Sequence, residues 1–111
     1  MSTKHKPLVW LHALLKTPPL SQKARIEAGY LLRLLQLGVN LSLPQSRPMP
    51  SIGVHCHDLR IQDENKIWRL FYRVDADAII VVLWLEKKTN KTSDEVINLC
   101  RKRLKFYDME R

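Results

Sequence analysis

The chain has 111 residues, of which 45% are hydrophobic and 27% are charged. This composition is typical of a globular protein and excludes a disordered chain, and the length predicts a single domain over residues 1–111 with residues 1–6 as a flexible tail. Lysine and arginine outnumber aspartate and glutamate by 19 to 11, so the net charge is +8. This charge favours an anionic partner such as nucleic acid. The alternative is that the charge serves only to keep the protein soluble.

The sequence carries no sign of a membrane or export segment. Its longest apolar run, residues 78–85, is far shorter than the ~20 residues of a membrane helix. The N-terminal string MSTKHKP lacks the apolar core of a signal peptide. We therefore expect a cytoplasmic protein. In this reducing compartment Cys56 and Cys100 are expected to be free thiols.

The N-terminal half is predicted to hold a short strand and two helices. Residues 7–11, PLVWL, are rich in strand formers and predict an edge strand opened by Pro7. Residues 12–16 are expected to form a brief helix that ends at the string TPP. A longer helix is expected from the N-cap Ser21 to Leu37, with apolar residues at helical spacing at Ala24, Ala28, Leu31, Leu32 and Leu35.

The middle of the chain is predicted to form a loop and then a β-meander. After Gly38, which ends the helix, residues 40–53 carry three prolines and are expected to form a long irregular connection. Three antiparallel strands are expected at residues 55–61, 67–74 and 78–86. The last is apolar throughout, as in a central strand covered on both faces, whereas WRLFYR in the middle strand alternates and is expected to keep one face polar.

The string EKKTNKT precedes a predicted C-terminal helix. Thr92 and Glu95 form a capping box at its start, and its apolar side is lined by Val96, Leu99, Cys100, Leu104 and Tyr107. Lys87, Lys88 and Lys91 stand just before this helix, whose N-terminus disfavours cations and favours an anion. The alternative is a loop of solvated lysines, which costs little because surface charges are screened.

A cluster of arginines is expected on the polar face of the meander. In a hairpin that turns at Glu64 and Asn65, Arg60 faces Arg69, and the opposite face is apolar throughout, with Leu59 against Leu70, Ile61 against Trp68 and His57 against Tyr72. Facing like charges are destabilising. Either Asp58, Asp75 or Glu86 offsets them, or the face binds a phosphodiester, which guanidinium groups match well. Together with the lysines, the arginines favour a nucleic-acid backbone site.

Other chemistry is disfavoured by the pattern. In the string HCH, His55 and His57 are expected on one strand face and Cys56 on the other, so the three cannot reach one metal, and no further pair stands at zinc spacing. His57 and Cys100 are expected to be packed residues, as are the three tryptophans, Trp10, Trp68 and Trp84. Tyr107 either closes the core or turns its hydroxyl to the basic face.

The strings LRI, WRLFYR and EKKTNKT, followed by a capped basic helix, resemble the RelE/ParE toxin superfamily. The strings KPLVWL, RPMPSIG and KKTNKT resemble its HigB-like, phage-derived branch, and the likeness extends from Lys6 to about Tyr107. It implies a small α+β fold in which N-terminal helices and a C-terminal helix pack on an antiparallel sheet. It also implies the toxin of a type II toxin–antitoxin system, which cuts mRNA on the ribosome and is bound by a helix-turn-helix antitoxin.

The resemblance also implies roles for individual residues. Members of the family cleave without a metal or other cofactor, by attack of the ribose 2′-hydroxyl on the adjacent phosphate. Arg60 and Arg69 would bind this phosphate and stabilise its transition state. Either Lys88 or Lys91 would protonate the leaving oxygen, and Tyr107 is the candidate aromatic hydroxyl. The expected RNA-binding residues are Arg73, Lys87 and Lys91.

One departure and two alternatives accompany the resemblance. Some relatives carry a histidine near the C-terminus as acid or base, and this chain has none after His57. ParE-like relatives share the fold but inhibit DNA gyrase without nuclease activity. The other alternative is a degenerate, basic RNA-binding module.

Overall fold

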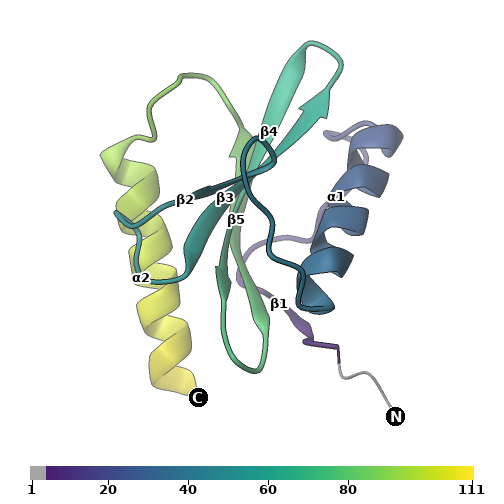
Figure 1. The fold of residues 1–111 in the computed structure, drawn as a ribbon. Coiled ribbons are helices and arrows are strands. Elements are labelled where there is room, and N and C mark those ends of the chain that lie inside the picture. Colours follow the sequence, from purple (N-terminus) through teal and green to yellow (C-terminus); the bar gives the residue numbers. More distant parts are fainter. Residues whose placement is uncertain (1–4) are drawn as a thin grey trace.

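In residues 5–111, which the computed structural model describes, five strands form one mixed sheet and one helix packs on each of its faces (Figure 1). The elements, in chain order, are β1 Leu8–Trp10, α1 Gln22–Gln36, β2 Ser46–Pro48, β3 Cys56–Asp63, β4 Lys66–Val74, β5 Ile79–Glu86 and α2 Asp94–Glu110. The expected α+β class is therefore confirmed. Of the expected tail, residues 1–4 lie outside the described residues. Lys6 is bound to the end of α1, because its N–H donates to Gln36 O at 3.1 Å.

The order of the strands across the sheet is β1-β5-β4-β3-β2. The predicted meander of β3, β4 and β5 is confirmed, and so is the hairpin register, in which Arg60 pairs with Arg69 and Leu59 with Leu70. The sheet is not antiparallel throughout, because β1 lies parallel to β5. β1 is an edge strand, as expected, and β5 is a central strand.

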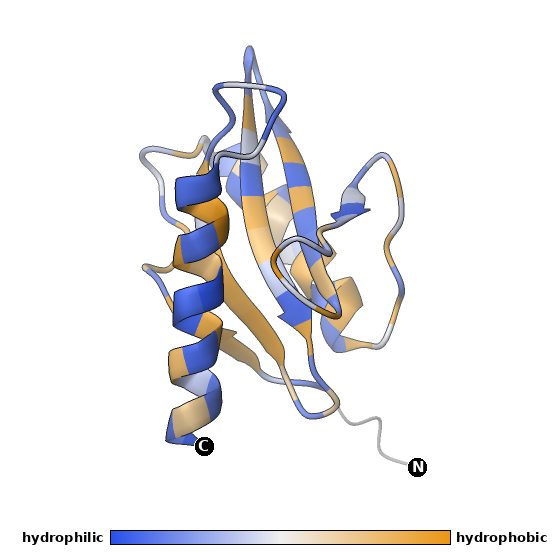
Figure 2. Ribbon diagram, turned by 90° about the vertical axis from the view of Figure 1, so that its left-hand side faces the viewer, coloured by the Kyte–Doolittle hydropathy of each residue, from blue (hydrophilic) through white to orange (hydrophobic). Residues whose placement is uncertain are grey.

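Both faces of β5 are covered, as its apolar sequence predicts. Ile79 and Val81 pack in the core on the α1 side, and Ile80 and Val82 pack in the core on the α2 side. Figure 2 shows hydrophobic residues concentrated along the central strands behind α2. The alternation is interrupted by a bulge, because Phe71 pairs with Leu83 whereas Tyr72 pairs with Val81. Two successive residues, Val82 and Leu83, therefore face α2.

α1 begins and ends where the sequence predicts. The Ser21 hydroxyl caps it by accepting a bond from Ala24 N at 3.0 Å, and Gly38 follows its end with φ of 89°. The five apolar residues expected on its inner face are all buried. Asp63, at the end of β3, binds the start of the helix to the sheet, since its Oδ2 accepts bonds from Ser21 N at 3.0 Å and Trp68 Nε1 at 2.9 Å.

Two predictions for the N-terminal half are wrong. Residues 12–16 form no helix; they cover the sheet edge as irregular chain, and Ala13 O accepts a bond from Trp84 Nε1 at 2.6 Å. The connection over residues 40–53 is not wholly irregular either, because it contains β2, which pairs with β3. Its Ser46 hydroxyl shares a buried hydrogen bond of 2.6 Å with the Tyr72 hydroxyl.

Two predictions for the C-terminal half are also wrong. The second face of β4 is not polar and solvated, because α2 covers it and both Arg69 and Phe71 are buried. The N-cap of α2 is Ser93 rather than Thr92, and its hydroxyl accepts a bond from Val96 N at 3.2 Å. Of the residues expected on the inner face of α2, Cys100 and Leu104 are buried, Val96 and Tyr107 are partly buried, and Leu99 is exposed. Ile97, which was not expected there, is partly buried on this face.

The core contains the residues expected there. Trp68 is buried, and Trp10 and Trp84 pack partly buried against the same core on the α1 side. Both cysteines are free and buried. In the described part of the chain, neither α1 nor α2 has the length and hydrophobicity that crossing a bilayer requires.

The first prediction concerns the pH dependence of stability. Hydrogen bonds from the Ser21 N–H and the Trp68 indole hold the pKa of Asp63 below its ordinary value. Asp63 therefore stabilises the fold above the unfolded pKa of about 3.9, and this contribution is lost as the pH falls through the folded pKa. Asp63→Asn should lower the free energy of unfolding at pH 7, with a deficit that shrinks below about pH 4. Urea unfolding at several pH values measures this, with Glu27→Gln, an exposed carboxylate of α1, as the control. A deficit that is constant with pH would contradict it.

The second prediction concerns the thiols. Burial raises the pKa of Cys56 to about 11 and that of Cys100 to about 12, so little of either is thiolate at pH 8. A chromogenic disulfide reagent at pH 8 should label neither cysteine in the native protein and both in urea. Rapid labelling of either thiol without denaturant would show that the α2 side of the core is open to solvent.

Candidate nucleic-acid interface

Two arginines on neighbouring strands share one buried carboxylate. Arg60 on β3 is the register partner of Arg69 on β4. Asp58 is fully buried, and its Oδ2 accepts hydrogen bonds from Arg69 Nε at 2.9 Å and Arg69 Nη2 at 2.7 Å. Arg60 Nε lies 3.7 Å from the same oxygen. Asp58 is thus the acid that offsets the repulsion between the two facing cations.

The two arginines differ in what they leave available to a ligand. Arg69 is buried, and its Nη2 also donates to Thr92 Oγ1 at 2.5 Å, while its guanidinium carbon lies 4.9 Å from the centre of the Phe71 ring. The side chain of Arg60 is 27% exposed, although its Nε is itself buried and makes no hydrogen bond within residues 5–111. Arg69 is therefore committed mainly to the fold, whereas Arg60 keeps donors for a partner.

Residues 87–92, between β5 and α2, form what we call the lysine loop. Lys87 N anchors its start by donating to Ile67 O at 2.7 Å, and Thr92 anchors its end through Arg69. Lys88 Nζ lies 3.3 Å from the carboxylate of Glu86. Among residues 5–111, no carboxylate lies within ion-pair distance of Lys87 or Lys91. Two unpaired cations therefore stand on a loop fixed at both ends.

The lysine loop separates two open cavities. One, of about 340 Å³, lies between the loop and the start of α2, and its cationic lining consists of Arg69, Lys87, Lys88 and Lys91. The other, of about 280 Å³, lies towards the β3–β4 turn and is lined by Lys66, Lys87 and Lys88. Of the described residues, Glu86 is the one carboxylate that lines either cavity. Both cavities therefore carry an excess of positive charge.

The N-terminus of α2 does not provide a vacant anion site. Ser93 caps it, and Asp94 and Glu95 occupy its first turn. Acidic residues in this position already complement the partial positive charge of the helix end. The positive character of this region therefore comes from the lysine side chains.

The predicted site residues fall into two groups. Arg69, Lys87, Lys88 and Lys91 come together at the lysine loop, with Arg60 one strand farther from it. Arg73 and Tyr107 are not among them, because they lie towards the other end of α2. Fifteen residues of helix separate this end from the lysine loop by about 20 Å at 1.5 Å per residue.

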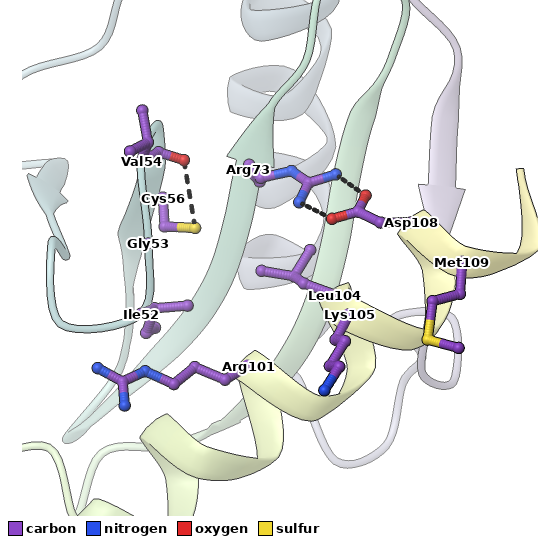
Figure 3. Close-up of a pocket in the computed structure, with 10 residues that line it drawn as sticks. All are labelled: Ile52, Gly53, Val54, Cys56, Arg73, Arg101, Leu104, Lys105, Asp108 and Met109. Atoms are coloured by element: carbon purple, nitrogen blue, oxygen red, sulfur yellow. Dashed lines mark hydrogen bonds and ion pairs between the residues drawn. The ribbon is translucent and has the colours of Figure 1, made fainter.

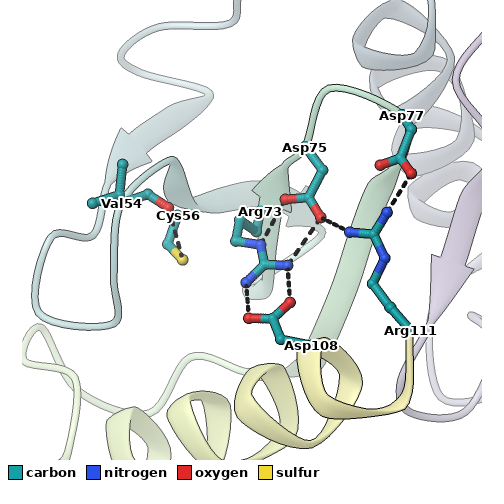
Figure 4. Close-up of polar contacts among 7 residues, drawn as sticks. All are labelled: Val54, Cys56, Arg73, Asp75, Asp77, Asp108 and Arg111. Carbon is teal, nitrogen blue, oxygen red and sulfur yellow. Dashed lines mark hydrogen bonds and ion pairs between the residues drawn. The ribbon is translucent and has the colours of Figure 1, made fainter.

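Arg73 belongs to a network of acidic residues (Figure 4). It donates to Asp75 at 2.6 and 2.9 Å and to Asp108 at 2.7 and 3.0 Å. These bonds raise the pKa of Arg73, and the bond from Arg73 lowers the pKa of Asp108. Tyr107 lies beside the guanidinium groups of Arg73 and Arg111, 6.0 and 5.4 Å from its ring centre. The network fixes the C-terminal end of α2 to the sheet.

The histidines follow a different arrangement from the predicted one. His55 precedes β3 with φ of 63° and is exposed, so it does not share a strand face with His57. His57 stacks on Tyr72 with ring centres 5.2 Å apart, and burial lowers its pKa. It is therefore a packed, neutral histidine at pH 7. Within residues 5–111, no group of three His, Cys, Asp or Glu side chains is placed to hold a metal.

Two residues at the lysine loop were not among the expected site residues. Glu86 lines both cavities, and Lys66 extends the basic lining towards the β3–β4 turn. Lys66 could have been predicted from the hairpin register. In that register Lys66 pairs with Asp63, at the end of the sheet where β5 also finishes. Glu86 stands directly before the lysines in sequence, which offered a signal for a carboxylate among them.

Comparison with known proteins gives one family. The family model described as phage-derived protein Gp49-like (DUF891) matches residues 18–105, which span α1, β2 to β5 and most of α2. These proteins are a RelE-like toxin family of toxin–antitoxin systems, associated with endonuclease-like toxin function. No curated protein and no solved structure matches the chain.

The third prediction separates the roles of the two arginines. Arg69→Ala leaves Asp58 buried without its partner and should lower the free energy of unfolding by about 3–5 kcal/mol. Arg60→Ala removes a longer, partly exposed contact and should cost less than about 1 kcal/mol. Urea unfolding measures both. In the double variant Asp58→Leu with Arg69→Leu, much of the loss should be recovered, because no buried charge is left unpaired. Equal, small losses for the two single variants would contradict the assignment.

Proposed function

Because the chain belongs to the phage-derived Gp49-like family, we propose that it is a HigB-like toxin that cleaves mRNA on the ribosome at the lysine loop. Its antitoxin would be a helix-turn-helix protein encoded by the adjacent gene. The observation that carries the proposal is the presence of two unpaired cations, Lys87 and Lys91, on a loop fixed at both ends, with the partly exposed Arg60 one strand farther away.

The charge and shape of the loop suit an RNA backbone. Lys87 and Lys91 have no carboxylate partners among the described residues, so a bound phosphate would not have to displace one. Release of the counterions condensed on RNA would contribute to binding and make it depend on salt. The two cavities on either side of the loop are open and carry lysines in their linings, so successive phosphates could lie in them.

The proposed reaction uses no metal. The ribose 2′-oxygen attacks the adjacent phosphorus, the bond from phosphorus to the 5′-oxygen breaks, and the products are a 2′,3′-cyclic phosphate and a free 5′-hydroxyl. Glu86 accepts the proton of the 2′-hydroxyl, and Lys88 donates one to the leaving 5′-oxygen. Glu86 and Lys88 are 3.3 Å apart in the free protein, so the substrate would enter between them.

The remaining cations have supporting roles. Lys87, Lys91 and Arg60 would bind the non-bridging oxygens and neighbouring phosphates, where charge develops in the transition state. Arg69 is better placed as a positioning residue than as a contact to substrate, because it is buried and holds Thr92. Arg73 and Tyr107 have no role in this reaction, since acidic residues and α2 hold them about 20 Å away.

The fourth prediction tests the lysine loop. Lys87→Ala with Lys91→Ala should abolish growth arrest and reduce mRNA cleavage by about 100-fold or more, as for loss of preorganised donors at a developing charge. Primer extension on mRNA from expressing cells measures the cleavage. Lys16→Ala with Lys23→Ala removes the same charge from exposed positions outside the site and should have no effect.

Two outcomes with the wild-type protein would contradict the nuclease. Cell death with intact transcripts would favour a gyrase inhibitor, and harmless expression of the protein would favour a binding module.

Glu86→Gln extends this test to the base. Loss of the base should slow cleavage by about 100-fold or more while RNA binding is kept or strengthened. If Glu86 serves only to neutralise Lys88, the variant would bind RNA more tightly and cleave it as fast as the wild type.

A further inference from the structure

An apolar groove lies on the opposite part of α2 from the lysine loop. It has a volume of about 530 Å³ and runs between residues 49–55 and the C-terminal half of α2 (Figure 3). We call it the α2 groove. Its apolar lining consists of Ile52, Val54, Cys56, Leu104 and Met109. Val54 is 76% exposed and Met109 is 72% exposed, so two large apolar side chains stand in water at its rim. Exposed apolar groups gathered around a concavity are typical of a binding site.

The outer wall of the α2 groove is fixed by hydrogen bonds. Met49 N donates to Cys56 O at 2.8 Å, and Ile52 N donates to Met49 O at 3.0 Å. Arg101 Nε on α2 donates across to Ser51 O at 2.7 Å. The groove is therefore formed before any partner arrives, which reduces the entropy lost on binding.

The rim of the α2 groove is positively charged. Arg101 and Lys105 line it, and neither has a carboxylate within ion-pair distance in the part of the chain that the structure describes. Arg73 also lines it, but its charge is met by Asp75 and Asp108. In Figure 2 the side of α2 turned to the viewer carries hydrophilic bands interrupted by hydrophobic ones. The complement of this surface is an apolar side chain flanked by carboxylates.

Two other occupants fit less well. A second copy of the chain would bring the same basic rim against this one, and the net charge of +8 opposes that contact. RNA would find its phosphates attracted to the rim, but the apolar walls offer no hydrogen-bond partners to its sugars. An acidic, amphipathic protein segment matches both the lining and the rim.

We propose that the α2 groove is the docking site of the antitoxin, which inserts an apolar side chain between Val54 and Met109 and pairs its carboxylates with Arg101 and Lys105. The identity of the partner rests on the proposed function. Lys105 lies about 20 Å along α2 from Thr92, so docking here leaves the lysine loop uncovered. Antitoxin binding and RNA cleavage are therefore separable by substitution.

The fifth prediction tests this separation by titration calorimetry with the purified product of the adjacent reading frame. Val54→Asp and Met109→Asp should each weaken its binding by about 30-fold or more, as for the loss of an interface hot spot. Lys105→Glu should weaken it by about 10-fold, with a reduced dependence on salt. Ile26→Asp and Tyr30→Asp on α1, at positions 63% and 62% exposed, are matched controls and should bind as the wild type does.

Two outcomes overturn the inference. One is that the groove variants bind the product with wild-type affinity, or that only the α1 control variants lose affinity for it. The other is failure of the wild-type chain to bind this product at all. Growth arrest and mRNA cleavage by the same groove variants, expressed alone, should match the wild type. If the wild type binds the product through the groove yet cleaves no mRNA, the proposed nuclease function fails and the docking site stands.

Discussion

The buried pair of Asp58 and Arg69 is the interaction on which the candidate site depends. Asp58 is fully enclosed between the sheet and α2, and a carboxylate in that position is tolerated only when it is paired and hydrogen-bonded. Arg69 provides the pairing and continues to Thr92 at the end of the lysine loop. One guanidinium therefore pairs with Oδ2 of the buried acid, whose Oδ1 has no hydrogen-bond partner among the described residues, and holds the loop on which the free cations stand.

This arrangement changes how the paired arginines are understood. Facing arginines on two strands suggest a ligand because their repulsion needs an anion, and here the protein supplies that anion itself. The charge of Arg60 is less completely neutralised than that of Arg69. Its Nε comes no closer than 3.7 Å to Asp58 Oδ2, and its side chain is partly exposed. The proposed phosphate site therefore lies at the end of β5, at the lysine loop, rather than at the facing arginines.

Most of the fold could be predicted from local pattern. The register of β3 and β4 followed from a short turn and one apolar face, and α1 followed from its cap, its spacing and Gly38. The placement of β1 parallel to β5 could not be read, because nothing in PLVWL specifies its direction. β2 was not expected because prolines stand in and around it, and Pro48 is tolerated because β2 is the edge strand opposite β1.

The site was less predictable because burial depends on what covers a strand. WRLFYR alternates, and only the position of α2 over it makes Arg69 an interior residue. The bulge in β5 could not be predicted either, because every residue around it is apolar. It turns Val82 and Leu83 to the same side of the sheet. Val82 O then accepts a bond from Arg103 Nη1 at 3.0 Å, so a third arginine also helps to fix α2. Arg73 and Tyr107 lie towards the other end of α2 from the lysine loop, a separation that their positions in the sequence did not reveal.

The distribution of ion pairs distinguishes structural cations from available ones. Arg73 holds the C-terminal end of α2 to the sheet through Asp108, whereas Arg69 pairs with Asp58 within the sheet and binds Thr92 just before α2. Among the described cations without such partners, Lys87 and Lys91 stand on the lysine loop, and Arg101 and Lys105 stand at the rim of the α2 groove. Because a large unpaired charge opposes the compact state rather than supporting it, these two places contribute little to folding. These four cations are the ones that the two proposed partners would bind, an RNA backbone at one end of α2 and an acidic protein segment at the other.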